Sequence, residues 1–203
     1  VGSEMCIRDS CKTIKEDINI SHIPVILLTA RDDRQSQISG YKNGADGYLS
    51  KPFEVEMLME LIRNRLKNRE YTKKRYLNAG LIPTPEESTI SLTDETFLIK
   101  LNSIIQENIE NSNLGIQFIC QEVGLGRSSL YNKLKALTGM GANEYISKLR
   151  IEKAITLISG TDMPFSEIAE KTGFTTPSYF STTFKQYTGE TPSQYKERKK
   201  KGL

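Results

Sequence analysis

The sequence predicts an α/β fragment followed by an all-α domain in which a long helix joins two helix-turn-helix units. Three patterns predict this organisation. Residues 24–30 form a continuous apolar run with β-branched members, which is typical of a strand buried on both faces. Residues 114–139 and 164–189 repeat one helical pattern. Residues 142–159, which lie between the two copies, keep helical spacing throughout.

The first ten residues show neither helix nor strand periodicity. Their string, Val-Gly-Ser-Glu-Met-Cys-Ile-Arg-Asp-Ser, resembles a translated sequencing adapter. We therefore expect residues 1–10 to be non-native or disordered and to carry no function.

The α/β part is expected over residues 11–68. It begins with the end of a helix, and a second strand follows the apolar run. Because strands and helices alternate, the pattern indicates α/β architecture. The expected elements are a helix end at 12–20, a strand at 24–30, a polar helix at 31–43, a strand at 47–50 and a helix at 54–67.

Residues 69–93 read as a linker, because Gly80, Pro83 and Pro85 interrupt helical spacing. We expect it to be a passive tether. A domain over residues 94–203 follows, and it starts with a helix at about 94–111 that Thr93 or Asp94 can cap. A last helix should begin at Pro192 with Thr191 as its cap.

The repeat pairs residues 119–124 with 168–173, and each copy ends at a glycine that permits a left-handed turn. The second helix of each copy has an apolar stripe on one face. The stripe consists of Leu130, Leu134 and Leu137 in the first copy and of Phe180, Phe184 and Tyr187 in the second. The opposite faces carry small polar groups and lysine with almost no acid, which favours contact with base edges and phosphates.

The second half of the chain resembles the AraC/XylS family of DNA-binding domains. The motifs that carry the resemblance are Arg127-Ser128-Ser129-Leu130-Tyr131, Leu134-Lys135-Ala136-Leu137-Thr138-Gly139, Gly173-Phe174, Phe184-Lys185 and Thr191-Pro192-Ser193-Gln194-Tyr195. The resemblance implies a sequence-specific regulator of transcription whose two recognition helices enter successive major grooves of double-stranded DNA.

The faces predict two sets of DNA contacts. In the first groove we expect Arg127, Ser128, Ser129, Tyr131 and Asn132. In the second we expect Thr176, Ser178, Tyr179, Ser181 and Thr182, with the Tyr179 ring mostly packed. We expect Lys133, Lys135 and Lys185 to contact phosphates.

Residues 11–68 resemble the C-terminal half of a two-component receiver domain. Leu28-Thr29-Ala30, Gly44-Ala45-Asp46, Tyr48 and Lys51-Pro52-Phe53 carry the match. The resemblance implies a truncated, flavodoxin-like half in which Thr29, Tyr48 and Lys51 form the phosphorylation switch, with a cis peptide before Pro52. The acceptor aspartate of the family and its acidic metal-binding pair have no counterpart in this sequence, so we expect no phosphoryl acceptance and a vestigial switch.

Together, the two resemblances imply the C-terminal end of a hybrid two-component regulator, the output of a phosphorelay. The alternative is a receiver signalling module whose helical half serves protein contacts. Pairing of two copies through upstream regions is also open. The C-terminal cations, Lys196, Arg198, Lys199, Lys200 and Lys201, suit either a solvated tail or a phosphate contact.

Charge and composition narrow the class of protein further. The formal charge of +3 and a pI of about 8.6 permit nucleic-acid binding without requiring it. Three scattered cysteines and one histidine favour a reducing compartment and no metal site. We expect a cytoplasmic protein without cofactor, enzyme activity, secretory signal or membrane span, because no glycine-rich phosphate loop, nucleophile–base pair or long apolar run is found.

Overall fold

The computed structural model describes residues 4–79 and 91–200. The chain divides into two compact units, Val1–Ile99 with Ser128–Gly139 and Lys100–Arg127 with Met140–Leu203. The predicted fold class is confirmed: a small α/β part precedes an all-α part. No helix among the described residues has both the length and the apolar character needed to cross a membrane.

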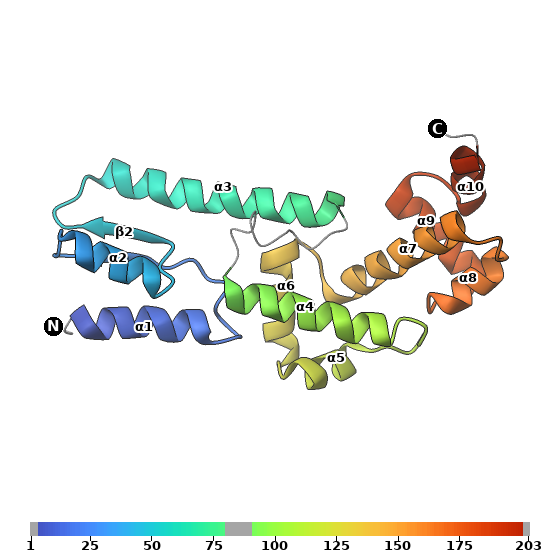
Figure 1. Cartoon of the computed structure of the whole chain (residues 1–203), viewed down its shortest axis with the longest axis horizontal. Helices are drawn as coiled ribbons and strands as arrows, with labels where there is room; N and C mark the ends of the chain where they lie inside the picture. The colour runs from blue at the N-terminus through green and yellow to red at the C-terminus, as the bar shows by residue number, and fades with distance from the viewer. Residues whose placement is uncertain (1–3, 80–90, 201–203) are drawn as a thin grey trace. The chain divides into compact units, whose positions relative to one another are not determined.

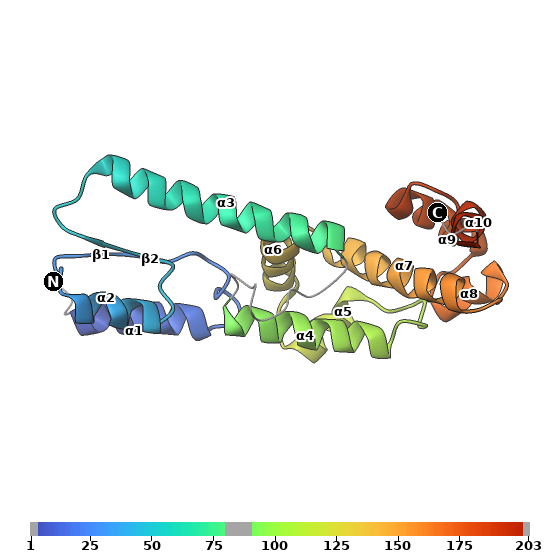
Figure 2. The ribbon, with the colours of Figure 1, turned by 45° about the horizontal axis from the view of Figure 1, so that its top comes forward.

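The α/β part is built on two parallel strands, which Figure 2 shows side by side. They pair from Ile26 with Gly47 to Thr29 with Ser50. The elements of this part are α1 (Glu4–Glu16), β1 (Ile26–Thr29), α2 (Arg34–Lys42), β2 (Gly47–Ser50) and α3 (Val55–Ala79).

Helices cover both faces of this sheet, as expected for a buried parallel pair. A Cβ atom on Gly47 would lie 2.9 Å from Cδ2 of Leu61, which shows how closely α3 approaches one face. A Cβ atom on Gly40 would lie 3.0 Å from the Tyr48 ring, which shows that α2 approaches the other. Successive strand residues point to opposite faces of the sheet, so Gly47 packs against α3 and Tyr48 against α2.

The expectation that residues 1–10 are disordered is wrong for residues 4–10, which the structure describes. Residues 4–10 form the first part of α1. Arg8 donates a hydrogen bond to the Ser39 hydroxyl at 3.2 Å, and the Cys11 side chain is buried. These tertiary contacts stabilise a helix that its own sequence signals only weakly.

The predicted linker, residues 69–93, is partly helical where the structure describes it. Helix α3 continues through the charged residues 69–79, and the next helix already starts at Leu92. Gly80, Pro83 and Pro85 lie outside the described residues. The expected cap is also shifted by a few residues: Ser91 accepts a hydrogen bond from the amide of Asp94, and Asp94 lies within the first turn.

Figure 1 labels the helices of the all-α part, and their bounds lie within a few residues of the predicted ones. They are α4 (Leu92–Glu107), α5 (Ile116–Val123), α6 (Arg127–Thr138), α7 (Ala142–Gly160), α8 (Phe165–Lys171), α9 (Pro177–Thr188) and α10 (Pro192–Lys200). Thr191 caps α10 as predicted, because its hydroxyl accepts a hydrogen bond from the amide of Gln194 at 3.3 Å.

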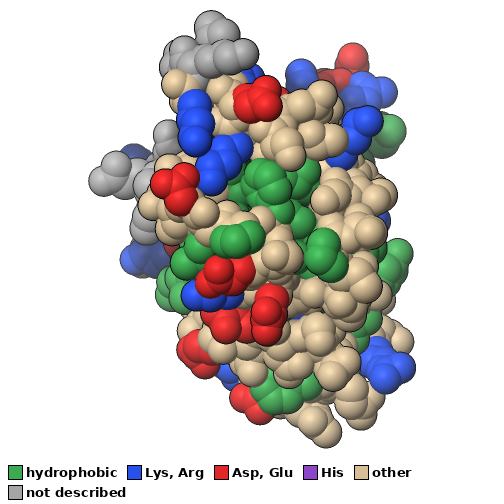
Figure 3. Space-filling view, turned by 90° about the vertical axis from the view of Figure 1, so that its right-hand side faces the viewer, with side chains coloured by type: hydrophobic (Ala, Val, Ile, Leu, Met, Phe, Trp, Pro, Cys, Tyr) green, Lys and Arg blue, Asp and Glu red, His purple; other side chains and the backbone are tan. Residues whose placement is uncertain are grey.

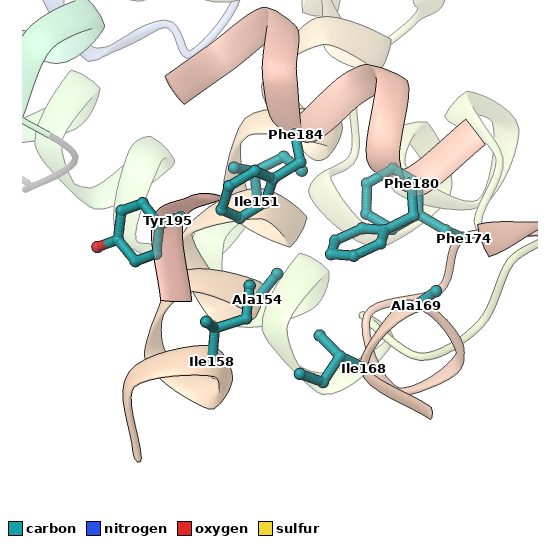
Figure 4. Close-up of a cluster of buried hydrophobic side chains, with 9 residues drawn as sticks. All are labelled: Ile151, Ala154, Ile158, Ile168, Ala169, Phe174, Phe180, Phe184 and Tyr195. Atoms are coloured by element: carbon teal, nitrogen blue, oxygen red, sulfur yellow. The ribbon is translucent and has the colours of Figure 1, made fainter. Parts of the chain in front are cut away.

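An aromatic core lies beneath α9 (Figure 4). The ring centroids of Phe174 and Phe180 are 5.3 Å apart, and those of Phe180 and Phe184 are 5.7 Å apart. Tyr195 of α10 adds a third ring contact, 5.6 Å from Phe184. Aliphatic side chains of α7 and α8 complete the cluster, namely Ile151, Ala154, Ile158, Ile168 and Ala169.

We predict that Phe184→Ala lowers the free energy of unfolding by about 3–5 kcal/mol, because it leaves a cavity in a fully buried site. Urea unfolding followed by circular dichroism measures this loss. Gln186→Ala, on the exposed side of the same helix, is the control and should change stability by less than about 0.5 kcal/mol. Equal small losses for both variants would contradict the assigned core.

Candidate nucleic-acid interface

Helix α6 presents most of its predicted contact residues to solvent. Its stripe residues Leu130, Leu134 and Leu137 are buried. The side chains on the other face are exposed, with Tyr131 54% accessible, while Ser129 is half-buried. The exposed set is Arg127, Ser128, Tyr131, Asn132 and Lys135.

Lys133 is a correction to the predicted site. We expected its side chain to contact phosphate, but it is 0% exposed. Its ammonium group forms a buried ion pair with Asp94 of α4 and donates to the Ser21 hydroxyl at 2.7 Å. Ser21 in turn donates to Asp94 at 2.7 Å. The group lies 5.1 Å from the centroid of the Phe97 ring.

The burial of Lys133 could have been predicted from helical spacing. Lys133 follows Leu130 by three residues and precedes Leu137 by four, so it lies on the apolar stripe. Burial lowers the pKa of the Lys133 ammonium group, although pairing with Asp94 opposes this shift. The pair therefore has a structural role: it attaches α6 to the start of α4.

Helix α9 exposes the corresponding face of the second unit. Ser178, Thr182 and Lys185 are exposed, and Ser181 is half-buried. Tyr179 is 52% exposed, so its ring is less packed than predicted, although it meets the edge of Phe174 with a centroid distance of 5.6 Å.

Thr176 has a capping role that we did not predict. Its hydroxyl accepts a hydrogen bond from the amide of Tyr179 at 3.2 Å, which makes it the N-cap of α9. The Pro177 that follows is the recognisable signal, because proline is favoured at the first position of a helix.

The charge on these two helices is one-sided. The sequences of α6 and α9, both described in full, contain neither Asp nor Glu. At the end of α9, Tyr187 donates a hydrogen bond to the carbonyl of Glu144 in α7 at 2.9 Å. Burial, followed by the nearby Glu144 charge, raises the pKa of Tyr187 to about 12. The hydroxyl therefore stays neutral and holds the end of α9 against α7.

The basic C-terminal helix is partly neutralised. Arg198 pairs with Glu190 at 2.8 Å, and Lys196 pairs with Asp162 at 3.3 Å. Lys199 and Lys200 remain exposed. Figure 3 shows Lys and Arg side chains (blue) near the top of the view, with Asp and Glu side chains (red) among them. Lys201 lies outside the described residues.

The three residues predicted to form the receiver switch gather at one end of the strand pair. Thr29 is buried, and its hydroxyl accepts a hydrogen bond from the amide of Arg31 at 3.2 Å. The amide of Lys51 donates to the Thr29 carbonyl at 2.6 Å, while the Lys51 side chain is exposed. The Tyr48 hydroxyl donates to the carbonyl of Arg31 at 2.9 Å. The peptide bond before Pro52 is cis, as the resemblance implies.

Two helix-turn-helix units with acid-free second helices are typical of a DNA-binding protein, and a parallel strand pair with a cis peptide before Pro52 is typical of part of a receiver. Comparison with known families agrees. Residues 8–63 match the response regulator receiver domain, and residues 119–198 match a helix-turn-helix domain. The chain therefore combines part of a response regulator receiver domain with an AraC-type DNA-binding domain.

Curated relatives match either nearly all of this chain or about half of it. Histidine kinase P4 of Formosa agariphila is 42% identical over 198 residues, which cover 98% of this chain and 14% of the relative. The HTH-type transcriptional activator RhaR of Salmonella dublin is 34% identical over 50% of this chain and 36% of its own length. The transcriptional regulatory protein YesN of Bacillus subtilis is 33% identical over 55% of this chain and 31% of its own length. The chain thus spans less than half of each of these relatives.

Among solved structures, the C-terminal domain of AraT, a response regulator from Geobacillus stearothermophilus, is 31% identical. The match covers 50% of this chain and 84% of that chain, with a TM-score of 0.47. The C-terminal domain of yesN from Fusobacterium nucleatum is 32% identical over 47% of this chain and 93% of that chain, with a TM-score of 0.45.

We predict that Lys133→Met lowers the free energy of unfolding by about 3–5 kcal/mol, because it leaves the Asp94 carboxylate buried without its partner. Adding Asp94→Leu should restore most of this loss, since an apolar pair replaces the ion pair. Urea unfolding of the single and double variants measures both effects.

Lys135→Met is the matched control, since it removes an exposed lysine from the same helix. It should leave stability within about 0.5 kcal/mol of the wild type. If Lys133→Met proved as mild as Lys135→Met, Lys133 would not be the buried partner of Asp94.

Proposed function

We propose that this chain is the sequence-specific DNA-binding output of a phosphorelay, in which α6 and α9 read successive major grooves of one duplex. The observation that carries the proposal is the pair of exposed, acid-free faces on the second helix of each helix-turn-helix unit. Short polar side chains suit base edges, and cations suit phosphates.

The proposed contacts follow the exposed residues. Base edges in one groove meet Arg127, Ser128, Ser129, Tyr131 and Asn132 of α6. Those in the next groove meet Ser178, Tyr179, Ser181 and Thr182 of α9, with Thr176 at its start. Lys135 and Lys185 contact phosphates, and the exposed Lys199 and Lys200 of α10 are candidates for the same role.

The domain boundaries belong to the same proposal. Residues 11–68 form the C-terminal half of a receiver, residues 69–93 connect it, and residues 94–203 form the DNA-binding domain. The relative from Formosa agariphila is named a histidine kinase, and this chain matches 14% of its length. We infer that the segment supplies receiver and output functions, that it has no enzyme activity of its own, and that it acts in the cytoplasm.

Binding to two duplexes at two salt concentrations tests the proposal. One duplex is selected by the full chain from a randomised library, and the other has the same composition in shuffled order. We expect tighter binding to the selected duplex, with affinity for both falling as salt rises, because phosphate contacts release counterions. Equal affinity for the two duplexes, or affinity that does not depend on salt, would contradict the proposal.

We predict that Lys135→Ala weakens binding to both duplexes by the same factor and reduces the salt slope by about 1, because one phosphate contact is lost. Lys153→Ala, on α7, is a control of equal charge change and should leave the slope unchanged. A loss confined to the selected duplex would show that Lys135 contacts a base.

We predict that Asn132→Ala costs about 1–3 kcal/mol on the selected duplex and little on the shuffled one, because an amide side chain reads a base edge. A repeat of the library selection with the variant should show relaxed preference at particular base pairs in one groove only. An unchanged selected sequence would remove Asn132 from the reading face.

A further inference from the structure

A buried arginine lies in α7, the helix between the two helix-turn-helix units. Arg150 of α7 is 9% exposed. Its Nη2 atom donates a hydrogen bond to the carbonyl of Asn111 at 2.7 Å. Its guanidinium carbon lies 6.0 Å from the centroid of the Phe174 ring. Its Nε atom is buried and has no hydrogen-bond partner among the described residues.

The two partners of Arg150 lie far apart in the sequence, one in the loop before the first helix-turn-helix unit and one within the second. Asn111 lies in the loop that leads into α5, and its carbonyl also accepts the amide of Leu114 at 3.0 Å. Phe174 lies in the turn between α8 and α9, and its ring contacts both Tyr179 and Phe180 of α9 (Figure 4 labels Phe174 and Phe180). One side chain therefore touches both the loop before α5 and the turn of the second helix-turn-helix unit.

The backbones of these two segments are in direct contact at Gly173. This residue has a φ of +71°. A Cβ atom there would lie 2.2 Å from the Ile109 carbonyl oxygen and 2.8 Å from Nη2 of Arg150. Only glycine fits such a site, because both the conformation and the space exclude a side chain. The guanidinium group thus lies against the point where loop and turn meet.

An apolar side chain could fill the space that the Arg150 side chain occupies. Burial lowers the pKa of Arg150, which shows that the fold opposes the charged form. A buried ionic group contributes little net stability compared with an apolar side chain of similar size. A planar guanidinium, however, can hydrogen-bond a carbonyl and stack on a ring at the same time, which fixes the orientation of both.

We propose that Arg150 is a positioning residue for DNA reading, which fixes the turn before α9 to the loop before α5 so that α9 holds a defined orientation. The DNA-reading role of this orientation rests on the proposed function above. The residue acts through Asn111 and Phe174 and does not itself touch DNA.

Hydrogen exchange of the full chain tests the positioning directly and needs no DNA. We expect Arg150→Met to speed the exchange of amides in residues 109–115 and 172–176 together, and to leave α7 protected. Arg150→Lys should fall between wild type and Arg150→Met, since it keeps the charge without the planar fork.

Lys153→Met is the matched control. Lys153 lies one turn further along α7 and pairs with Glu110 of the same loop at 3.5 Å, but the Glu110 side chain is 66% exposed. An exposed pair of this kind contributes little, so exchange should stay at the wild-type rate. The positioning role would be overturned if Arg150→Met left amide exchange in residues 109–115 and 172–176 unchanged. It would also be overturned if exchange rose uniformly through the second helix-turn-helix unit.

Binding to the selected and shuffled duplexes described above is the second measurement. Arg150→Met should weaken binding to the selected duplex by about two- to thirtyfold and leave binding to the shuffled duplex unchanged, because a mispositioned α9 loses base contacts. Equal weakening on both duplexes would contradict the inference. If the wild-type chain itself failed to distinguish the duplexes, the proposed function would fail, and the exchange pattern would still decide whether Arg150 joins loop and turn.

Discussion

The second helix-turn-helix unit depends on the aromatic core beneath α9. Phe180 and Phe184 are fully buried, and Phe174 is nearly so. These three rings hold α9 by its inner face, so its outer face stays free of packing constraints. That outer face can therefore carry small polar groups and a lysine without loss of stability. The rings also hold the turn at Gly173, where Arg150 reaches them from α7.

The first unit reaches a similar arrangement by different chemistry. Its stripe is aliphatic, and one position of the stripe holds Lys133, whose charge is balanced by Asp94. A buried ion pair is weak evidence for stability, but removal of one partner is costly. The pair therefore specifies how α6 lies against the start of α4. The second helix of each unit thus has a buried inner face and a largely exposed outer face.

Most of the fold could be predicted from the sequence, because glycines mark the helix ends in both copies of the repeat. Gly124, Gly173 and Gly189 all adopt the left-handed conformation that ends a helix. Periodicity could not reveal partners that lie far apart along the chain. The sequence predicted Lys133 as a surface cation, because its partner Asp94 lies 39 residues away in the chain. Arg150 gave no signal, since its value depends on a carbonyl and a ring from two separate turns. The first part of α1, residues 4–10, was missed for the same reason, because contacts with residues far along the chain hold it.

The central claim is that two reading helices of one chain enter neighbouring grooves. Hydroxyl-radical footprinting of the full chain on its selected duplex tests this most directly. The account predicts two protected segments whose centres lie about 10 base pairs apart, on one side of the duplex. A single protected segment, or even protection along the whole duplex, would contradict it.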